Sequence, residues 1–361
     1  MNKRPTIMEV NLNTFKDNIS KIKKKINSKE LMPIIKANAY GTYINKCIDL
    51  IKEFNIVGVA TVEEGVYLRE NGYDKDIFIL NQPAIEEINS IIEYHLTTGI
   101  SSIEFLKELK IKDTKVKIHL EIETGMNRTG INPIDLNNIF EILKNSNISV
   151  EGIYTHLSSA DTDKEYTLKQ LDIFKKAVAI AKENINEIKY IHALASTGIL
   201  KYLDNETNLV RPGIIMYGYD SFEDATKELD LKPICTLKSK IVYLKTVPEN
   251  TPISYSKTYI TEKKTKVATI PIGYADGLKR CLSNKGYVVV NNKKCKIIGN
   301  ICMDSCMIDV TEIDDVQIGT DVYIWDNNII TVDDIARECN TINYEILSTI
   351  SSRVERVFIN K

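Results

Sequence analysis

Along the first two-thirds of the chain, eight short apolar runs are separated by segments that mix hydrophobic and polar positions. Short apolar runs typical of buried strands lie near residues 31–37, 57–61, 77–81, 96–100, 116–122, 150–156, 189–195 and 208–211. Between them, segments such as Ile134–Leu143 and Glu165–Ala181 repeat their apolar positions with the period of a helix. Eight strands that alternate with helices predict an α/β fold, a (β/α)8 TIM-type barrel.

The pattern changes after Pro233, where strand-like runs are separated by turns rich in Asn, Asp and Gly. The predicted strands lie at Ile234–Val247, Lys266–Ile272, Tyr287–Val290, Val322–Trp325 and Val354–Ile359, and short helices are expected at Thr331–Glu338 and Tyr344–Thr349. We therefore expect a barrel domain over residues 1–232 and a mostly β C-terminal domain over 233–361, which is too small for a second barrel.

The run from Val116 to Glu123 alternates strictly, with apolar side chains on one face and Lys117, His119, Glu121 and Glu123 on the other. The outer face of a barrel strand packs on helices, so the polar set would point into the lumen. We expect a paired polar network there, because unpaired buried charges are costly. The alternative is that this strand is misplaced.

The composition excludes several classes of protein. A formal net charge of −2 over 361 residues gives no basic face for nucleic acid or for an anionic membrane. No apolar run is long enough to span a bilayer, and the start of the chain does not resemble a signal peptide. We expect a soluble, cytoplasmic protein with no nucleic-acid or membrane partner.

The seven cysteines are expected to be buried or half-buried thiols in a reducing compartment. Cys302 and Cys306 are the candidates for a zinc pair, within a predicted strand over residues 301–308. Four residues along a strand span about 13 Å, which is too far for one tetrahedral metal. The sequence therefore predicts no metal site.

One lysine ends an apolar run in Ile34-Ile35-Lys36-Ala37-Asn38-Ala39-Tyr40-Gly41. Burial of an amine lowers its pKa and makes it a nucleophile. Such a lysine is a natural Schiff-base partner for an aldehyde cofactor. On these residues alone, a surface lysine just past a strand remains the alternative.

Other polar residues also fall where the predicted barrel strands end. Together with the lysine, the set is Lys36, Arg128, His156, Ser196 and Arg211. Active sites of barrels lie at the C-terminal ends of their strands. The spacing therefore places a candidate active site at this end of the barrel.

These motifs resemble those of the alanine racemases, which are pyridoxal-phosphate enzymes built from a barrel and a β domain. The resemblance covers essentially the whole chain. Its motifs are Lys36-Ala37-Asn38-Ala39-Tyr40-Gly41, Thr124-Gly125-Met126-Asn127-Arg128, Tyr154-Thr155-His156, Arg211-Pro212-Gly213, Pro271-Ile272-Gly273-Tyr274-Ala275-Asp276-Gly277 and Ile301-Cys302-Met303-Asp304. The resemblance implies an amino-acid racemase, with alanine as the expected substrate. It also implies a homodimer whose active sites borrow residues from the partner's β domain.

The resemblance assigns the two catalytic bases. Lys36 would hold pyridoxal 5'-phosphate and act as one base, and Tyr255 of the other subunit would act on the opposite face of the substrate. His156 and Arg211 would favour the ionised form of that tyrosine through hydrogen bonding and positive charge. Arg211 would also face the pyridine nitrogen and, because arginine stays protonated, would keep this nitrogen unprotonated.

The resemblance also implies where the phosphate binds. The cofactor phosphate is expected in a cradle formed by Tyr40, Ser196 and the backbone N–H groups of Gly213 and Ile214. A glycine lets the backbone approach closely, and the start of a helix offers free N–H donors.

Substrate contacts are expected from both subunits. Arg128 would bind the phenolic oxygen of the cofactor and the substrate carboxylate. From the partner, Met303 would offer a backbone N–H beside Asp304, and Tyr274 would narrow the entrance.

Three positions depart from the usual family sequence. Glu121 replaces a carbamylated lysine, and we hypothesise that it pairs with Arg128. Ser352 replaces a pocket tyrosine, which would widen the substrate pocket. The usual Gly-His-Gly is Gly41-Thr42-Tyr43. A change of one pocket side chain shifts discrimination by about 1–3 kcal/mol, so alanine turnover is compatible with these changes.

Three alternatives to an alanine racemase remain open. The first is a serine or broad-specificity racemase of the same family. The second is a non-catalytic pyridoxal-phosphate homeostasis protein, although such proteins resemble the barrel alone. The third is a lysine Schiff-base aldolase on a plain barrel.

Overall fold

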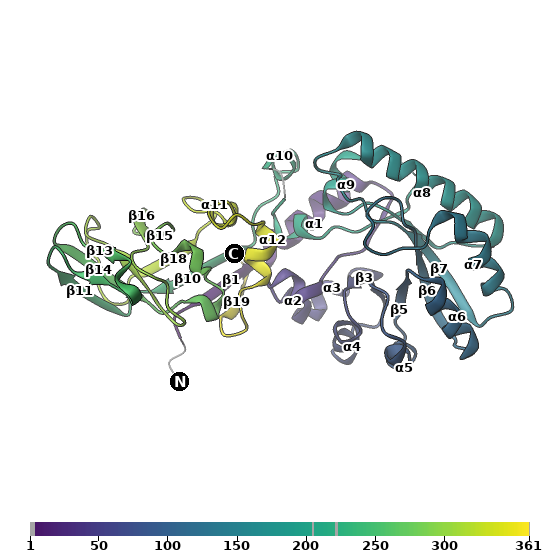
Figure 1. Ribbon diagram of the computed structural model, residues 1–361, viewed down its shortest axis with the longest axis horizontal. Coiled ribbons are helices and arrows are strands. Elements are labelled where there is room, and N and C mark those ends of the chain that lie inside the picture. The colour runs from purple at the N-terminus through teal and green to yellow at the C-terminus, as the bar shows by residue number, and fades with distance from the viewer. Residues whose placement is uncertain (1–3, 204–205, 221–222, 361) are drawn as a thin grey trace.

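The computed structural model describes residues 4–203, 206–220 and 223–360. Figure 1 shows an elongated molecule with the barrel strands at one end and the β-rich elements at the other.

The eight predicted barrel strands are present. They are β2 (Glu30–Leu31), β3 (Ile56–Val59), β4 (Asp76–Ile79), β5 (Thr97–Ile100), β6 (Val116–Glu121), β7 (Ile148–Tyr154), β8 (Tyr190–His192) and β9 (Leu209–Val210). β3 to β8 form one parallel sheet, and β2 pairs in parallel with β9. Parallel bridges between Ile34 and Gly58 and between Ala195 and Arg211 join these two sheets into a closed ring. The barrel prediction is confirmed.

Helices connect the barrel strands. The α-helices of this part are α1 (Leu12–Ile26), α3 (Ile48–Ile51), α4 (Val62–Glu70), α5 (Ile88–Glu93), α6 (Ile103–Ile111), α7 (Leu136–Leu143), α8 (Lys164–Asn184), α9 (Ser196–Lys201) and α10 (Glu223–Glu228). Side chains of Thr61, Ser102 and Asp163 cap α4, α6 and α8 by accepting backbone N–H bonds, as expected at helix starts. Within the described ranges, no helix is both long and apolar enough to cross a bilayer.

The second domain contains two main sheets. One has the order β16-β15-β18-β10-β1-β19, with strands Lys293–Lys296, Tyr287–Val290, Asp321–Trp325, Cys235–Lys240, Ile7–Asn11 and Glu355–Ile359. The other consists of β11 (Tyr243–Val247), β14 (Thr265–Ile270) and β17 (Cys306–Asp309). A small hairpin joins β12 (Pro252–Ile253) to β13 (Tyr259–Ile260), and two helices, α11 (Val332–Glu338) and α12 (Asn343–Ser348), complete the domain.

The first strand of the chain belongs to this second domain. β1 pairs antiparallel with β10 and in parallel with β19, so that Val10 lies between Cys235 and Phe358. The alternating burial of β1 matches one core-facing side. Residues 7–11 therefore lie outside the barrel, within the span expected for the first domain. The boundary near residue 232 stays a prediction.

The predicted strand over residues 301–308 is wrong in its first half. Cys302 donates its backbone N–H to the Ser305 carbonyl at 2.9 Å, and β17 begins only at Cys306. All seven cysteines are free thiols. Six are buried or half-buried as expected, and Cys281 is exposed, contrary to the expectation.

The centre of the barrel holds a polar network, as the alternation from Val116 to Glu123 predicts. His119 is fully buried and stacks on Phe78, with ring centroids 4.3 Å apart. Its Nδ1 lies 2.9 Å from Nε2 of His192. Lys117, near the start of β6, is exposed and pairs with Glu151 at 2.7 Å. Of the predicted polar set, His119 and Glu121 are buried, and Lys117 is exposed.

Gly152 on β7 is required by this stack of rings, because a Cβ there would lie 2.7 Å from the His119 ring. We expect Gly152→Ala to lower the free energy of unfolding by about 1–3 kcal/mol, the usual cost of overpacking. Urea unfolding followed by circular dichroism measures the change. Ser149→Ala, at an exposed position of the same strand, is the matched control and should change stability by less than about 0.5 kcal/mol. Equal midpoints for the two variants would contradict the packing argument.

Candidate active site

A cavity of about 290 Å³ opens where the barrel strands end. Six of the predicted site residues line it together: Lys36, Tyr40, His156, Ser196, Arg211 and Gly213. A larger groove of about 1050 Å³ near α1 and α3 is lined by none of the predicted site residues. The smaller cavity is therefore the candidate active site, as barrel geometry predicts.

The lysine sits at the start of an unusual turn. Ala37, Asn38, Ala39 and Tyr40 have φ values between 51° and 56°, and Gly41 follows at 79°. These values describe a left-handed turn in the segment labelled α2 (Lys36–Tyr40). Each L-residue there costs roughly 1–2 kcal/mol relative to a right-handed conformation. Strain of this kind persists only where the surroundings hold it, and it gathers at functional sites.

The surroundings of Lys36 disfavour its charged form. Desolvation by burial is the largest cause, and the positive charges of Arg128 and Arg211 add to it. Glu64 acts in the opposite direction, yet the net effect lowers the pKa of the Lys36 amine. A larger fraction of neutral, nucleophilic amine follows at a given pH.

Arg211 is held from several sides. Its Nη2 donates to the carbonyl of Thr155 at 2.7 Å and to that of Ala193 at 3.2 Å. Its Nη1 lies 2.7 Å from Nδ1 of His192. Burial lowers the pKa of Arg211 to about 10, which leaves the group protonated at neutral pH. The site thus contains a fixed, buried positive charge.

This fixed charge determines the tautomers of two histidines. Because Arg211 can only donate, Nδ1 of His192 must accept and its Nε2 must carry the proton. Nε2 of His192 then donates to Nδ1 of His119, 2.9 Å away. Burial lowers the pKa of His119 to about 3 and that of His192 well below its usual value, so both rings stay neutral. The chain of hydrogen bonds therefore keeps the Arg211 guanidinium in one orientation.

His156 lies on the same side of the guanidinium. Its Nδ1 is 3.4 Å from Nη2 of Arg211. Burial, followed by the charges of Arg211, Arg128 and Lys36, lowers the pKa of His156 to about 3. Because Arg211 can only donate, Nδ1 of the neutral His156 accepts from Nη2, and the ring adds no positive charge.

A cradle for an anion is formed opposite the lysine. The Gly213 N–H donates to Oγ of Ser196 at 3.1 Å. A Cβ on Gly213 would lie 2.4 Å from the Tyr40 hydroxyl, so only glycine leaves this space open. Ile214 follows as the first residue of a short 3-10 turn, η4 (Ile214–Tyr217). Hydroxyls and a close backbone fit a phosphate, and the nearby Lys36 amine fits an aldehyde on the same molecule.

The hypothesis that Glu121 pairs with Arg128 stays a prediction, because the described contacts of Glu121 are with other residues. Ser101 Oγ donates to the Glu121 carboxylate, which is buried beside the Tyr154 hydroxyl. Arg128 is exposed and forms no ion pair with Glu121 among the described residues. The shorter glutamate stays in the barrel wall, where a neutral donor satisfies it. Arg128 still lies close enough for its charge to act on the Lys36 amine.

Three residues assigned to the substrate side or the second base lie in the β domain, away from the cavity lining. Tyr255, Tyr274 and Met303 are 72%, 43% and 53% exposed. Their loops are joined by hydrogen bonds to backbone carbonyls, since the Asn300 side chain donates through Nδ2 to the Tyr255 carbonyl at 2.9 Å and the Ala275 N–H donates to the Met303 carbonyl at 3.0 Å. We call these three residues the β-domain patch. An exposed cluster of large side chains is typical of an interaction surface.

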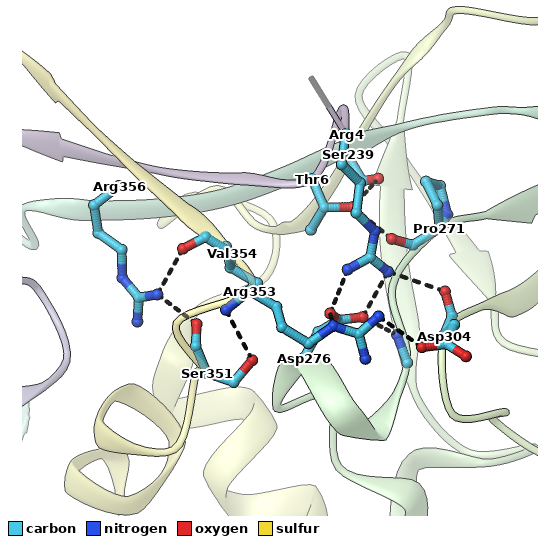
Figure 2. A network of polar contacts seen from close by, with 11 residues as sticks. Arg4, Thr6, Ser239, Pro271, Asp276, Asp304, Ser351, Arg353, Val354 and Arg356 are labelled. Carbon is cyan, nitrogen blue, oxygen red and sulfur yellow. Dashed lines mark hydrogen bonds and ion pairs between the residues drawn. The ribbon is translucent and has the colours of Figure 1, made fainter. Parts of the chain in front are cut away.

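A network of ion pairs holds the loops behind the patch (Figure 2). The buried Asp276 carboxylate accepts hydrogen bonds from Arg4 and from the Gly273 N–H. Arg353 bonds Asp304 at 2.7 Å and lies 3.5 Å from Asp276. Ser352, the residue before Arg353, is exposed and does not line the cavity. The network fixes the position of Asp304 and of the turn that carries Tyr274.

Three residues at or near the cavity are absent from the set predicted from the sequence. Tyr344 of α12 lines the cavity, with its ring 5.9 Å from that of Tyr40. His192 binds Arg211, and Glu64 accepts the Ala37 N–H at 2.6 Å. His192 is the lone histidine in the apolar run 189–195, and this pattern could have indicated a buried polar contact. Nothing in the local pattern around Tyr344 or Glu64 indicates a place near Lys36.

Comparison with known proteins identifies relatives over the full chain. The profile described as "Alanine racemase, N-terminal domain" matches residues 10–221. The profile "Alanine racemase, C-terminal domain" matches residues 234–358. "Alanine racemase 2" of Caldanaerobacter subterraneus is 39% identical over 99% of this chain and 95% of its own length. "Alanine racemase" of Halothermothrix orenii is 39% identical over 100% of this chain and 99% of its own.

Solved structures give the same result. The alanine racemase of Clostridium difficile 630 superposes with a TM-score of 0.93 at 33% identity and covers 100% of this chain and 97% of its own. The alanine racemase of Bacillus anthracis with bound L-Ala-P superposes with a TM-score of 0.92 at 31% identity, covering 100% and 96%. The two-part architecture is therefore shared along the whole chain.

The lowered pKa of Lys36 has a consequence for stability. Below its folded-state pKa, the protein must bury a charged amine. Between that pKa and the unfolded value near 10.5, the unfolded chain binds a proton that the folded chain does not, so stability rises with pH. We expect Lys36→Met to stabilise the cofactor-free protein at neutral pH and below, with the gain fading toward pH 10.5. Urea unfolding across this range measures it.

Lys169→Met, at an exposed position of α8, reports the effect of removing a surface lysine. A Lys36→Met variant that is no more stable than this control at pH 7 would contradict the assigned burial of the amine.

Proposed function

The chain belongs to the alanine racemase family, and from this premise we propose that it interconverts L- and D-alanine with pyridoxal 5'-phosphate as cofactor. The observation that supports this proposal most strongly is the Lys36 amine, buried beside the fixed charge of Arg211 in a cavity that also contains the Ser196–Gly213 cradle. An aldehyde-reactive amine and an anion cradle in one cavity match the two ends of this cofactor.

When bound, pyridoxal 5'-phosphate links to an amino group through its aldehyde and withdraws electrons from the neighbouring Cα. Tyr40, Ser196, Gly213 and Ile214 would hold its phosphate. Arg211 would donate to its ring nitrogen, which leaves that nitrogen unprotonated because the arginine retains its own proton. This chain would thus limit the electron withdrawal that the ring supplies, and the proton would return to Cα quickly.

Racemisation requires proton transfer on both faces of Cα. The Lys36 amine serves one face, because its lowered pKa keeps part of it neutral. For the other face we propose Tyr255 of the partner subunit, since Tyr255 is exposed in the β-domain patch and does not line the cavity of its own chain. Met303 and Tyr274 of the same patch, together with the neighbouring Asp304, would reach the partner's site.

This division of residues requires a homodimer with shared active sites. A two-fold dimer makes each contact twice, so both sites would be complete. Arg128, which is exposed and does not line the cavity of its own chain, would hold the substrate carboxylate. A cytoplasmic location also stays a proposal.

The alternative substrate is serine or a wider range of amino acids. This alternative rests on Ser352, a small, exposed residue that takes the place of the tyrosine usual in the family, although it does not line the cavity of its own chain. A non-catalytic cofactor carrier is disfavoured by the β domain, which matches the family profile over residues 234–358. An aldolase is disfavoured by the same domain.

The reaction is tested with purified protein loaded with pyridoxal 5'-phosphate in D₂O. We expect loss of optical rotation of L-alanine, with deuterium at Cα of both enantiomers, and no such loss in cofactor-free protein. A panel of other L-amino acids, serine first, is run in parallel. Turnover of serine as fast as alanine would favour the broad-specificity alternative. No exchange at Cα for any amino acid would contradict a racemase.

Shared sites are tested by mixing two inactive variants, Lys36→Met and Tyr255→Phe. In a mixed dimer one site has both defects and the other has neither, because each site combines Lys36 of one chain with Tyr255 of its partner. After subunit exchange, random pairing should restore about one quarter of the wild-type activity. Mixing Lys36→Met with Lys36→Ala is the control and should restore none. No recovery in the first mixture, with exchange shown by mass spectrometry, would contradict shared sites.

A further inference from the structure

Arg356 on β19 reaches from the β domain to the loop that carries the lysine. Its Nε donates to the Gly41 carbonyl at 2.9 Å. The rest of the guanidinium binds carbonyls of its own segment, since Nη1 donates to Ser351 and Val354 at 2.6 and 2.7 Å and Nη2 donates to Ile350 at 2.6 Å. Figure 2 shows two of these bonds. The planar guanidinium thus connects the Gly41 carbonyl to the carbonyls of Ile350, Ser351 and Val354 in the C-terminal segment.

This arginine is unusual because it is partly buried without a carboxylate partner among the described residues. Burial lowers its pKa, and the Tyr43 ring lies 4.5 Å from the guanidinium carbon. Carbonyl dipoles and an aromatic face therefore carry the charge. A lysine could not reproduce this pattern, since it lacks the planar array of donors.

The loop that Arg356 holds needs support from outside. Four consecutive L-residues, from Ala37 to Tyr40, have left-handed φ values. On the barrel side, the Glu64 carboxylate accepts the N–H groups of Ala37 at 2.6 Å and Ala60 at 2.8 Å. Arg356 holds the other end of the turn at Gly41. Two oppositely charged side chains, one from each domain, therefore hold the first and last residues of the turn.

The fit at Gly41 is close. A Cβ there would lie 2.3 Å from the Leu347 carbonyl oxygen at the end of α12. The turn is thus pressed against the β domain at the point where Arg356 binds it. A shift of this turn would carry Lys36, the first residue of the α2 segment, with it.

We propose that Arg356 is a positioning residue, which fixes the left-handed turn from the β domain and thereby directs the Lys36 amine into the cavity. The catalytic meaning of this role rests on the proposed function, but the role itself concerns the geometry of the cofactor-free chain. When the turn loosens, the Lys36 amine gains contact with water and its pKa returns toward the ordinary value.

The test uses the full-length, cofactor-free protein and the variants Arg356→Met and Arg356→Lys. Lys36 is labelled by acetic anhydride over a range of pH, and the extent of labelling at this residue is read by peptide mass spectrometry. We expect the midpoint of the labelling curve to shift to higher pH in both variants, because neither makes the fork of bonds. Arg337→Met on α11 removes an exposed arginine and should leave the midpoint unchanged.

Thermal unfolding shows that each variant is folded at the labelling temperature. If Arg356→Met does not fold, the test uses Arg356→Lys, because lysine keeps the positive charge and a similar side-chain length. In cofactor-loaded protein, a misplaced lysine should reduce kcat for alanine about tenfold or more, with a smaller change in KM. Unchanged labelling midpoints and unchanged kcat in a folded variant would overturn the proposal.

The two proposals fail in different ways. A wild-type protein with no racemase activity would remove the proposed function and leave the labelling result interpretable. An active wild type whose Lys36 labels identically with and without the Arg356 side chain would remove only the positioning role.

Discussion

The burial of one amine among positive charges is the constraint on which the rest of this structure depends. Lys36 is desolvated and faces the charges of Arg128 and Arg211, with Glu64 as the opposing charge. A protein that only needed stability would place an apolar residue there, because buried unpaired charge is costly. The strained turn after Lys36 adds to this cost. A catalytic role explains both costs, because the amine must react with an aldehyde and then transfer a proton.

The two domains share the work of building the site. The barrel supplies the cavity, and its lumen is filled by a hydrogen-bonded series from Arg211 through His192 to His119, which fixes the direction of the guanidinium. The β domain presents the exposed patch and supports it with the Asp276 network. The C-terminal segment connects Arg356 to the Asp276 network through Ser351. The Ser351 carbonyl accepts a hydrogen bond from Arg356, and the Ser351 N–H donates to the Asp276 carbonyl at 3.1 Å.

Periodicity and strand ends predicted much of this from the sequence. The eight barrel strands, the lumen position of His119 and the gathering of Lys36, His156, Ser196 and Arg211 follow from local patterns. The remaining features depend on contacts between distant segments. Three examples are the pairing of β1 with β19, the hydrogen bond from Arg356 to Gly41 and the hydrogen bond from Ser101 to Glu121. In each, the two partners are far apart in the sequence, and no local pattern relates them. The left-handed φ values at Ala37 and Ala39 also contradict the local backbone propensity of alanine. Departures from local propensity of this kind are expected at functional sites.

Borohydride reduction of protein incubated with pyridoxal 5'-phosphate tests whether the Lys36 amine binds the cofactor aldehyde. We expect the yellow absorbance to be bleached and the peptide containing Lys36 alone to gain the mass of a reduced phosphopyridoxyl group. Modification of a different lysine, or an unmodified Lys36 in a protein that racemises alanine, would show that Lys36 does not have this role.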